Sequence, residues 1–277
     1  MRPDAPVVRL GRRSAIVLAV ASVVGLAMFA WPLLLRPAAG AAHATDAPLV
    51  FLLCMPMLVA VVLAAIADGT IDVRALAILG VLAGVGAALR PLGAGTGGIE
   101  LVFFLLVLAG RVFGPGFGFV LGASTLFASA LLTAGVGPWL PFQMLAAAWV
   151  GCVAGLLPRA RGRAEIVLLA TYGAVSAYGY GLLLDLWAWP FTFGAGADGG
   201  LAYVPGAPLV DNLRRFLLST IATSTLGWDT GRALTNVVAI LAIGAPVLAV
   251  LRRTVRLAAF DTSPVFDETD VVTATTP

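Results

Sequence analysis

Charge is scarce in this chain, and lysine is absent. Only 11% of the 277 residues are charged, and all of the cationic side chains at neutral pH are arginines. With 60% hydrophobic residues and a mean hydropathy of +1.01, the chain has too few polar residues to cover a soluble domain of this length. The bias toward Ala, Val, Leu and Gly is typical of a GC-rich bacterial genome. We therefore expect a multi-pass protein of a bacterial plasma membrane.

Cysteine and histidine are also scarce, which limits the possible chemistry. Cys54 and Cys152 lie far apart in apolar segments and form no CxxC motif, so buried thiols are favoured over a metal or redox site. His43 is the single histidine, and no paired acidic motif occurs. An intramembrane enzyme usually needs a set of such groups at depth. We expect neither catalytic activity nor a bound metal, and an enzyme is the least favoured alternative.

Walker motifs are missing as well. The stretch Gly93–Gly98 is rich in glycine but lacks the Gly-Lys-Ser/Thr ending of a phosphate loop. We expect no cofactor in this chain, and ATP-driven work would come from partner chains. The net charge of +3 does not indicate nucleic acid, because the arginines stand at the ends of apolar segments, where they set topology.

Long apolar segments joined by short turns dominate the sequence. A helix needs about 20 apolar residues to cross the hydrocarbon core. The sequence therefore predicts an all-α polytopic membrane protein with about eight spans and with both termini in the cytoplasm. The spans are Ala15–Leu35, Leu49–Ala67, Val73–Leu89, Ile99–Phe113, Phe117–Thr133, Trp139–Leu157, Glu165–Trp189 and Ala233–Leu251. Tight turns are expected at Gly114-Pro115-Gly116 and at Gly135-Val136-Gly137-Pro138.

The arginines support this topology. With a cytoplasmic start, only Arg36, Arg90, Arg214, Arg215 and Arg232 lie outside. A further crossing by the segment Leu213–Leu226 would move the arginines after Leu251 outside, so this segment is predicted to lie on or dip into the outer surface. The run Ala15–Leu35 is too long for a signal peptide and is predicted to remain as an anchor. Residues 257–277 are predicted to form a disordered acidic cytoplasmic tail.

Small residues recur at helical spacing in the third predicted span. Gly80, Gly84 and Ala88 stand four apart, and Ala75, Ala83 and Ala87 are predicted to lie close to the same side. Such residues allow close helix contact within a membrane. Packing inside the bundle and contact with a partner subunit both remain open.

Four features in a fixed order carry a resemblance to a known family. They are the small-residue helix, the run ELVFFLLVLAGRVFGPGFGFVLGA, the turn GPWLPFQML and the closing helix GRALTNVVAILAIGAPVLAVLRR. Residues 73–256 resemble the substrate-binding S component of energy-coupling factor (ECF) vitamin transporters of the actinobacterial type. The resemblance implies a six-helix core, preceded here by residues 1–72 with a basic segment and two extra helices.

The resemblance also implies a function. An S component captures a vitamin or related micronutrient, such as cobalamin, and works with an ECF transmembrane coupling subunit and two ABC ATPases. The small-residue face would then contact the coupling subunit. The absence of a His/Cys/Met cluster argues against nickel or cobalt as the cargo. A stand-alone secondary transporter is the alternative, and inverted repeats with charges at the membrane midplane would favour it.

Polar and aromatic residues gather at the predicted outer ends of the spans. Ionisable groups within a membrane are functional candidates by default. Gln143, close behind Pro141, is the strongest candidate, and Glu100 is expected to share an outward cavity with it, walled by Trp139 and Phe142. The full set of candidate substrate-binding residues is Arg90, Glu100, Trp139, Phe142, Gln143, Asp185, Trp228, Asp229, Arg232 and Asn236.

Several of these residues have plainer interpretations. Gln143 could bond to a neighbouring helix, and Asp229 with Arg232 could form a helix cap and a local ion pair. Asp185 is expected to have an interhelical partner or a ligand. Trp187 and Trp189 fit an interfacial aromatic belt. The long outer connection Pro190–Asp211 is either a lid over the cavity or an exposed link.

Overall fold

The computed structural model describes residues 11–34, 73–93, 96–192 and 200–260, and every element in these ranges is helical. The predicted span Leu49–Ala67, His43, Cys54 and the predicted tail beyond residue 260 lie outside the described residues. The elements are α1 (Arg12–Phe29), α2 (Trp31–Leu34), α4 (Val73–Leu92), α5 (Val102–Phe113), α6 (Pro115–Leu132), α7 (Leu140–Leu156), α8 (Arg163–Thr192), α9 (Leu209–Thr220), the π-helix η2 (Ile221–Asp229) and α10 (Thr230–Phe260).

Helix length and composition match an α-helical membrane protein. Five stretches in the described ranges are long and apolar enough to cross a membrane: Arg12–Phe29, Arg74–Leu92, Pro115–Leu132, Arg163–Thr192 and Leu209–Leu257. The apolar helices α5 and α7 are shorter, with 12 and 17 residues. Seven of the predicted spans coincide with described helices to within a few residues at most ends. The total of eight spans and the cytoplasmic location of the termini stay predictions.

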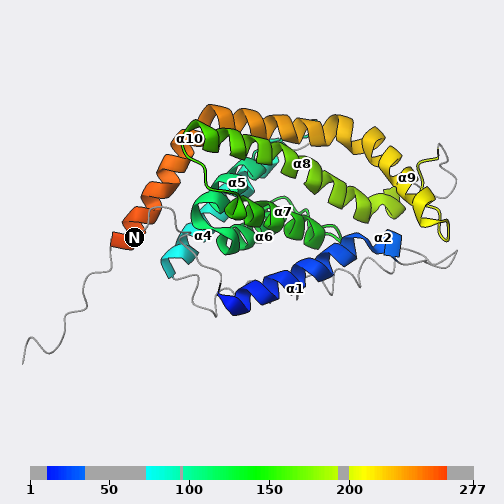
Figure 1. The fold of residues 1–277 in the computed structure, drawn as a ribbon, viewed down its shortest axis with the longest axis horizontal. Helices are drawn as coiled ribbons and strands as arrows, with labels where there is room; N and C mark the ends of the chain where they lie inside the picture. The colour runs from blue at the N-terminus through cyan, green and yellow to red at the C-terminus, as the bar shows by residue number, and fades with distance from the viewer. Residues whose placement is uncertain (1–10, 35–72, 94–95, 193–199, 261–277) are drawn as a thin grey trace, which may run out of the picture.

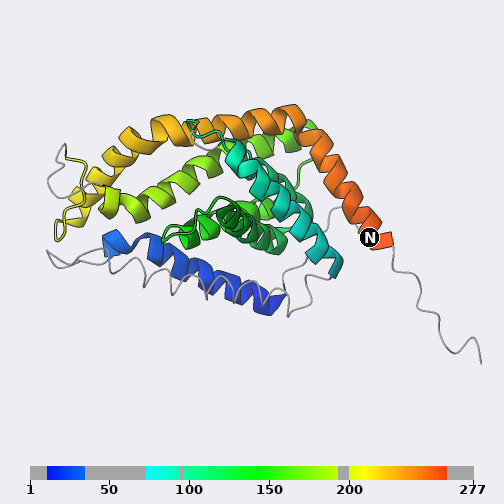
Figure 2. The same ribbon diagram turned by 180° about the vertical axis from the view of Figure 1, so that it is seen from behind.

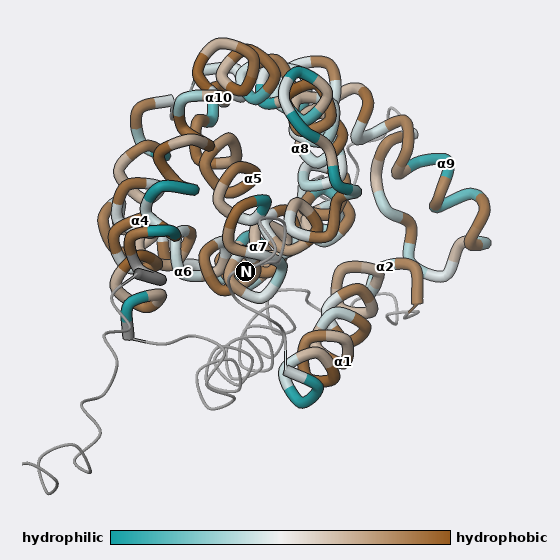
Figure 3. The backbone as a smooth tube through the Cα atoms, turned by 60° about the vertical axis from the view of Figure 1, so that its left-hand side comes forward, coloured by the Kyte–Doolittle hydropathy of each residue, from teal (hydrophilic) through white to brown (hydrophobic). Residues whose placement is uncertain are grey.

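The core of the bundle consists of α5, α6 and α7. These three helices lie in the middle of the molecule, with α1, α4, α8 and α10 around them (Figures 1 and 2). Nearly every residue of α5 is buried, whereas the outer helices present apolar side chains such as Val81, Val175 and Leu241 outward. Brown, apolar segments accordingly dominate the helices in Figure 3. A bundle that exposes apolar residues on its outer helices is suited to lipid.

Glycines bring the three core helices into backbone contact. A Cβ on Gly118 of α6 would lie 2.2 Å from the Gly151 carbonyl oxygen of α7, and a Cβ on Gly151 would lie 2.2 Å from the Gly118 oxygen. A Cβ on Gly110 of α5 would lie 2.1 Å from that same Gly151 oxygen. Only glycine permits these approaches. The tightest packing is thus in the core and not on α4.

Two tight turns connect the core helices, as the sequence predicts. Gly114 joins α5 to α6 with a φ of 102°, a conformation that favours glycine. Pro115 then starts α6, where its fixed φ and missing N–H are tolerated. The second turn follows Thr133 and leads into Leu140. Helices α5, α6 and α7 therefore run alternately up and down.

The helix α1 packs against the core helix α7. Phe29 lies edge-on to Phe142 at a centroid distance of 5.1 Å, and the Trp149 indole donates a hydrogen bond of 2.9 Å to the Ser22 hydroxyl. A Cβ on Gly25 would meet Leu145 at 2.3 Å. The two helices are antiparallel. The sequence assigned no role to the segment before residue 73, and these contacts make α1 part of the bundle.

The last three elements form one continuous helix. Helix α9 passes through η2 into α10 without a break, so the segment Leu213–Leu226 continues directly into the last predicted span (Figure 1). Its location at the outer surface stays a prediction. No proline interrupts the junction. The hydroxyls of Thr223 and Thr230 instead donate to the carbonyls of Ser219 and Thr225, at 2.9 and 2.6 Å. The chain widens into a π-helix there, and the long helix bends.

Arginines gather at one end of the bundle. This end contains the start of α1, α4 and α8 and the far part of α10. Its arginines are Arg12, Arg13, Arg74, Arg111, Arg159, Arg161, Arg163, Arg252, Arg253 and Arg256. We name it the arginine end. The opposite end contains the start of α5 and α7 and the junction of η2 with α10, and we name it the site end.

The small residues of α4 do not share one face. Ala75, Ala83 and Ala87 are buried, whereas Gly80 and Gly84 are exposed with no atom within 4 Å of a Cβ placed on them. Ala88 is exposed too. The predicted single contact face is therefore corrected, because successive residues of a helix are about 100° apart and the six positions divide between two sides. Only the exposed three are open to a partner.

Candidate functional site

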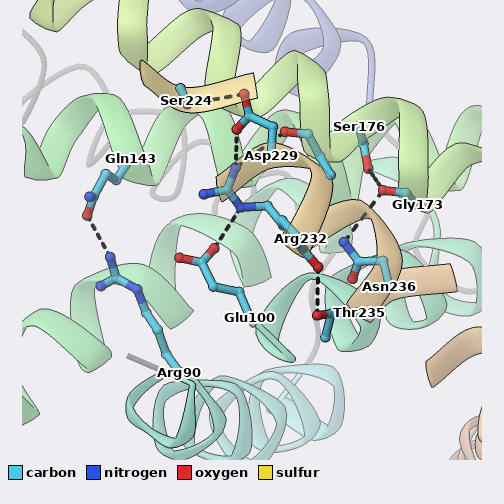
Figure 4. Close-up of polar contacts among 12 residues, drawn as sticks. Arg90, Glu100, Gln143, Gly173, Ser176, Ser224, Asp229, Arg232, Thr235 and Asn236 are labelled. Carbon is cyan, nitrogen blue, oxygen red and sulfur yellow. Dashed lines mark hydrogen bonds and ion pairs between the residues drawn. The ribbon is translucent and has the colours of Figure 1, made fainter. Parts of the chain in front are cut away.

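The predicted polar residues meet at the site end. Helices α4, α7, α8 and the continuous helix α9–η2–α10 each contribute at least one of them, and Glu100 comes from the loop before α5. We name this group the polar cluster: Arg90, Glu100, Gln143, Asp185, Asp229, Arg232 and Asn236. Figure 4 shows six of these residues pointing into the space between the helices.

Arg232 is the centre of the polar cluster. Its Nε donates to Glu100 Oε2 and its Nη1 donates to Asp229 Oδ1, each at 2.8 Å. The guanidinium also lies 4.9 Å from the Tyr180 ring centroid and 5.5 Å from that of Phe103. Only 7% of Arg232 is exposed. A buried arginine needs such partners, and here two carboxylates and two aromatic faces provide them.

A glycine loop brings Glu100 to this arginine. A Cβ on Gly98 would lie 2.0 Å from the Trp228 carbonyl oxygen, and one on Gly231 would lie 1.8 Å from the Gly97 oxygen. Gly98 has a φ of 83°. The loop before α5 can therefore lie directly on the junction of η2 and α10. Gly97 and Gly98 belong to the glycine-rich stretch Gly93–Gly98, which is not a phosphate loop. Their role is to allow close backbone contact with the junction of η2 and α10.

The two aspartates of the polar cluster share hydroxyl partners. Asp185 accepts a hydrogen bond from the Thr220 hydroxyl of α9, so its predicted interhelical partner is confirmed. Asp229 accepts a bond of 3.2 Å from Ser224. The local pair of Asp229 with Arg232 is confirmed, but the cap is not, because Asp229 lies inside a continuous helix. Gly181 leaves room for the Asp229 carboxylate.

Arg90 and Gln143 form a second, separate pair. Arg90 Nη2 donates to Gln143 Oε1 at 2.9 Å, which joins α4 to α7 (Figure 4). The bond to a neighbouring helix was one of the two interpretations of Gln143. Both side chains are half-buried. In contrast to Arg232, Arg90 has no carboxylate within ion-pair distance among the described residues.

Asn236 is buried and only partly satisfied. Its Nδ2 donates to the Gly173 carbonyl of α8 at 3.5 Å, and its Oδ1 has no hydrogen-bond partner. The hydroxyls of Thr125 and Ser129 on α6 are also buried without a partner. Buried polar atoms are nearly always paired in proteins, so these three atoms stand out among the described residues.

The predicted aromatic wall is corrected. Phe142 is fully buried between Phe29 and Trp187, with centroids at 5.1 and 4.5 Å, so its ring faces protein and not a cavity. Trp139 and Trp228 are exposed by 45% and 44% and remain available at the site end. The aromatic belt is wrong as well: Trp187 and Trp189 are 8% and 2% exposed, because Phe142 and Phe216 pack against them.

Part of the predicted lid is fixed in place. The Trp189 indole donates to the Leu201 carbonyl at 2.7 Å, and its ring packs edge-on against Tyr203. The Asn212 side chain accepts from the Val204 N–H and donates to the Val204 carbonyl, at 3.2 and 2.9 Å. Residues 200–208 are therefore anchored to α8 and α9.

A second buried ion-pair group lies at the arginine end. Glu165, at 3% exposure, binds Arg111 of α5 at 2.8 Å and Arg252 of α10 at 2.7 Å. Arg111 also donates to the Leu157 carbonyl at 2.9 Å. From the sequence alone, Arg111 and Arg252 are assigned only a role in topology. Glu165 follows Arg161 and Arg163 at the start of an apolar helix, and this position was the sequence signal for an ion-pair group.

Comparison with known proteins gives no family for this chain. No family model, no curated protein and no solved structure matches it. The resemblance to ECF S components therefore rests on the sequence features described above.

Proposed function

We propose that the protein is a membrane-embedded capture subunit of an ECF-type ABC importer, which binds a vitamin or related micronutrient at the site end. In this proposal it has no catalytic activity and no cofactor of its own. The observation that carries the proposal is the convergence of four helical segments and the loop before α5 on the polar cluster. Binding sites for small molecules are mostly apolar with a few placed polar groups, and the site end has this composition.

The orphan polar atoms support the proposal. Asn236 Oδ1 on α10 and the hydroxyls of α6 are buried but unpaired, and a bound molecule could supply their missing partners. The exposed indoles of Trp139 and Trp228 offer apolar area at the same end. Cobalamin remains a candidate cargo from the family resemblance, alongside other vitamins.

The proposed partners are a transmembrane coupling subunit and two ABC ATPases. The exposed part of the small-residue helix, at Gly80, Gly84 and Ala88, is the proposed contact with the coupling subunit. A partner helix could approach the α4 backbone closely there, because a Cβ on Gly80 or Gly84 meets open space. The arginine end would face the cytoplasm, in accord with the positive-inside tendency.

Native mass spectrometry of the detergent-purified chain tests the capture function. The chain is exposed to cobalamin, riboflavin, thiamine, biotin and folate, and the expected result is retention of one vitamin at a one-to-one ratio. A folded sample, established by circular dichroism and gel filtration, that retains none of the five would contradict the vitamin proposal.

A stand-alone secondary transporter is the second candidate. Charged residues buried within membrane-type helices are a feature of such transporters. Arg232 and Asp229 are buried, and they lie next to η2. Uptake by proteoliposomes that contain this chain alone, without an ATPase, would favour this candidate over the capture subunit.

A further inference from the structure

The two arginines of the polar cluster differ in their partners. Arg232 is neutralised by Glu100 and Asp229 at 2.8 Å each. Arg90 is half-buried, and its hydrogen bond to the described residues goes to an uncharged amide oxygen. Its side chain therefore has no carboxylate partner among the described residues and has N–H groups beyond the one that binds Gln143. Such a guanidinium is suited to an anion that enters from outside.

Unpaired hydroxyls lie on the helix next to Arg90. Helices α4 and α6 run in the same direction, and a Cβ on Gly86 would meet the Thr125 side chain at 2.6 Å. Arg90 is one helical turn beyond Gly86, and Ser129 is one turn beyond Thr125, so the register places Arg90 and Ser129 at the same level. The Ser129 hydroxyl is fully buried without a partner, as is that of Thr125. A hydroxyl donor at the level of an arginine without a carboxylate partner forms a suitable binding site for an anion.

Gln143 can serve both the empty and the occupied site. In the present arrangement its amide oxygen accepts from Arg90. A rotation of the amide by 180° would present its NH₂ group in place of the oxygen, so the same side chain can donate to an anion. A carboxylate at this position would replace the weak neutral acceptor with two charged oxygens, which match the fork of the guanidinium.

We infer that the captured molecule has a carboxylate and that Arg90 binds it, with Gln143 and Ser129 as additional hydrogen-bond donors. This inference rests on the proposed capture function and narrows its substrate class to organic anions. Biotin and folate satisfy it among the vitamins considered, whereas thiamine is a cation and riboflavin and cobalamin have no free carboxylate. The exposed Trp139, one turn before Gln143, would contact the apolar part of the molecule.

The experiment compares vitamins and variants by native mass spectrometry of the full-length chain. We expect biotin or folate to be retained, and the amide of the retained vitamin to bind much more weakly. Arg90→Gln should raise the Kd for the acid by about 10-fold to 100-fold, as loss of a charged hydrogen bond does. Arg90→Lys, which keeps the charge but loses the fork, should give a smaller increase. Ser129→Ala should raise the Kd a few-fold.

Arg214→Gln is the matched control. Arg214 is an exposed arginine of α9, so the substitution removes the same charge from the same protein without touching the polar cluster. Its Kd should equal that of the unaltered chain. Circular dichroism and gel filtration identify any variant that fails to fold. If Arg90→Gln fails to fold, Arg90→Lys still tests the inference.

The possible failures are distinguishable. Retention of riboflavin, cobalamin or thiamine with a Kd that Arg90→Gln leaves unchanged would overturn the inference and leave the capture function intact. For thiamine, loss of binding in Asp185→Asn would identify the group that binds it. A co-purified phospholipid that disappears in Arg90→Gln, with no carboxylate vitamin retained, would assign Arg90 to a lipid phosphate and overturn the inference. Retention of nothing would reject both proposals.

Discussion

Arg232 is the residue whose removal would leave the most buried negative charge without a partner. Two carboxylates face it at 2.8 Å, and Asp229 is only 1% exposed. Removing one partner of a buried ion pair leaves an uncompensated charge, which costs about 3 to 5 kcal/mol in proteins. The ion pairs at this position therefore fix the junction of η2 with α10 as well as the polar cluster.

Arg232→Met should lower the apparent Tm by roughly 10 °C in detergent, from that free-energy cost and the size of the chain. Arg253→Met on the same helix removes the charge of an exposed arginine and should leave the Tm nearly unchanged. Adding Asp229→Asn to Arg232→Met should recover part of the loss, because it removes one orphaned carboxylate. Equal Tm values for the two single variants would contradict this account. Thermal unfolding followed by intrinsic fluorescence measures the shift.

Sequence patterns locate the polar residues but not their partners. Glu100, Asp229, Arg232 and Gln143 could be selected because each is polar at the end of an apolar segment. The contact between Glu100 and Arg232 joins residues 132 positions apart, and no local pattern indicates it. Phe142 was assigned to a cavity wall, because the packing of Phe29 against it depends on the docking of α1.

The core helices depend on glycine at their crossing points. Gly151 is the point where α7 meets both α5 and α6, and its carbonyl oxygen would lie 2.2 Å from a Cβ on Gly118. Helices in lipid gain most of their association energy from this kind of close packing. Gly118 and Gly122 stand four residues apart, as do Gly151 and Gly155, and this spacing indicates close helix packing from the sequence alone. The same spacing on α4 directed attention to that helix instead.

Gly151→Ala should destabilise the protein by about 1 to 3 kcal/mol, because the added methyl group meets a backbone atom that cannot move aside. The apparent Tm should fall by about 5 °C. Gly84→Ala is the matched control, since nothing lies within 4 Å of its Cβ, and there alanine should be neutral or slightly stabilising. A larger loss in the control than in Gly151→Ala would reject the packing described for the core.

Element boundaries follow closely from the sequence, apart from the junction around η2. Apolar length and the Gly-Pro turns place α4 to α8 well, because these signals are local. The arginine count predicted that Leu213–Leu226 lies on or dips into the outer surface, because a crossing there would have moved the arginines after Leu251 outside. In the structure the hydroxyls around η2 bond to carbonyls one turn back, which keeps the chain helical through the junction.

Assembly with a coupling subunit is a property of the whole molecule. Gly84→Leu should abolish co-purification with that subunit and leave vitamin binding unchanged, because Gly84 is exposed on α4 and a Cβ placed on it has no atom within 4 Å. Gly179→Leu on α8 is the control, since its Cβ also meets open space. Assembly that survives Gly84→Leu, or that Gly179→Leu disrupts equally, would remove α4 from the proposed interface.

Charge is distributed unevenly along the whole molecule. The arginine end has most of the arginines, and the site end contains the polar cluster and the exposed indoles of Trp139 and Trp228. Hydropathy and the positions of the arginines suffice to predict this difference between the two ends, because both can be read along the sequence without knowledge of tertiary contacts. The inclusion of α1 in the bundle could not be predicted in that way, since it arises from particular contacts with Trp149 and Leu145.

Helix α10 connects the two buried ion-pair groups and contains a proline between them. One helix contains Arg232, which holds Glu100 at the site end, and Arg252, which holds Glu165 at the arginine end. The twenty residues between them span about 30 Å. Pro246 lies between the two arginines and cannot donate to the helix ladder, so α10 bends there (Figure 1). A change of the bend angle at Pro246 would move the Glu165 pair relative to the Glu100 pair, which makes this proline the hinge between the two ends of the bundle.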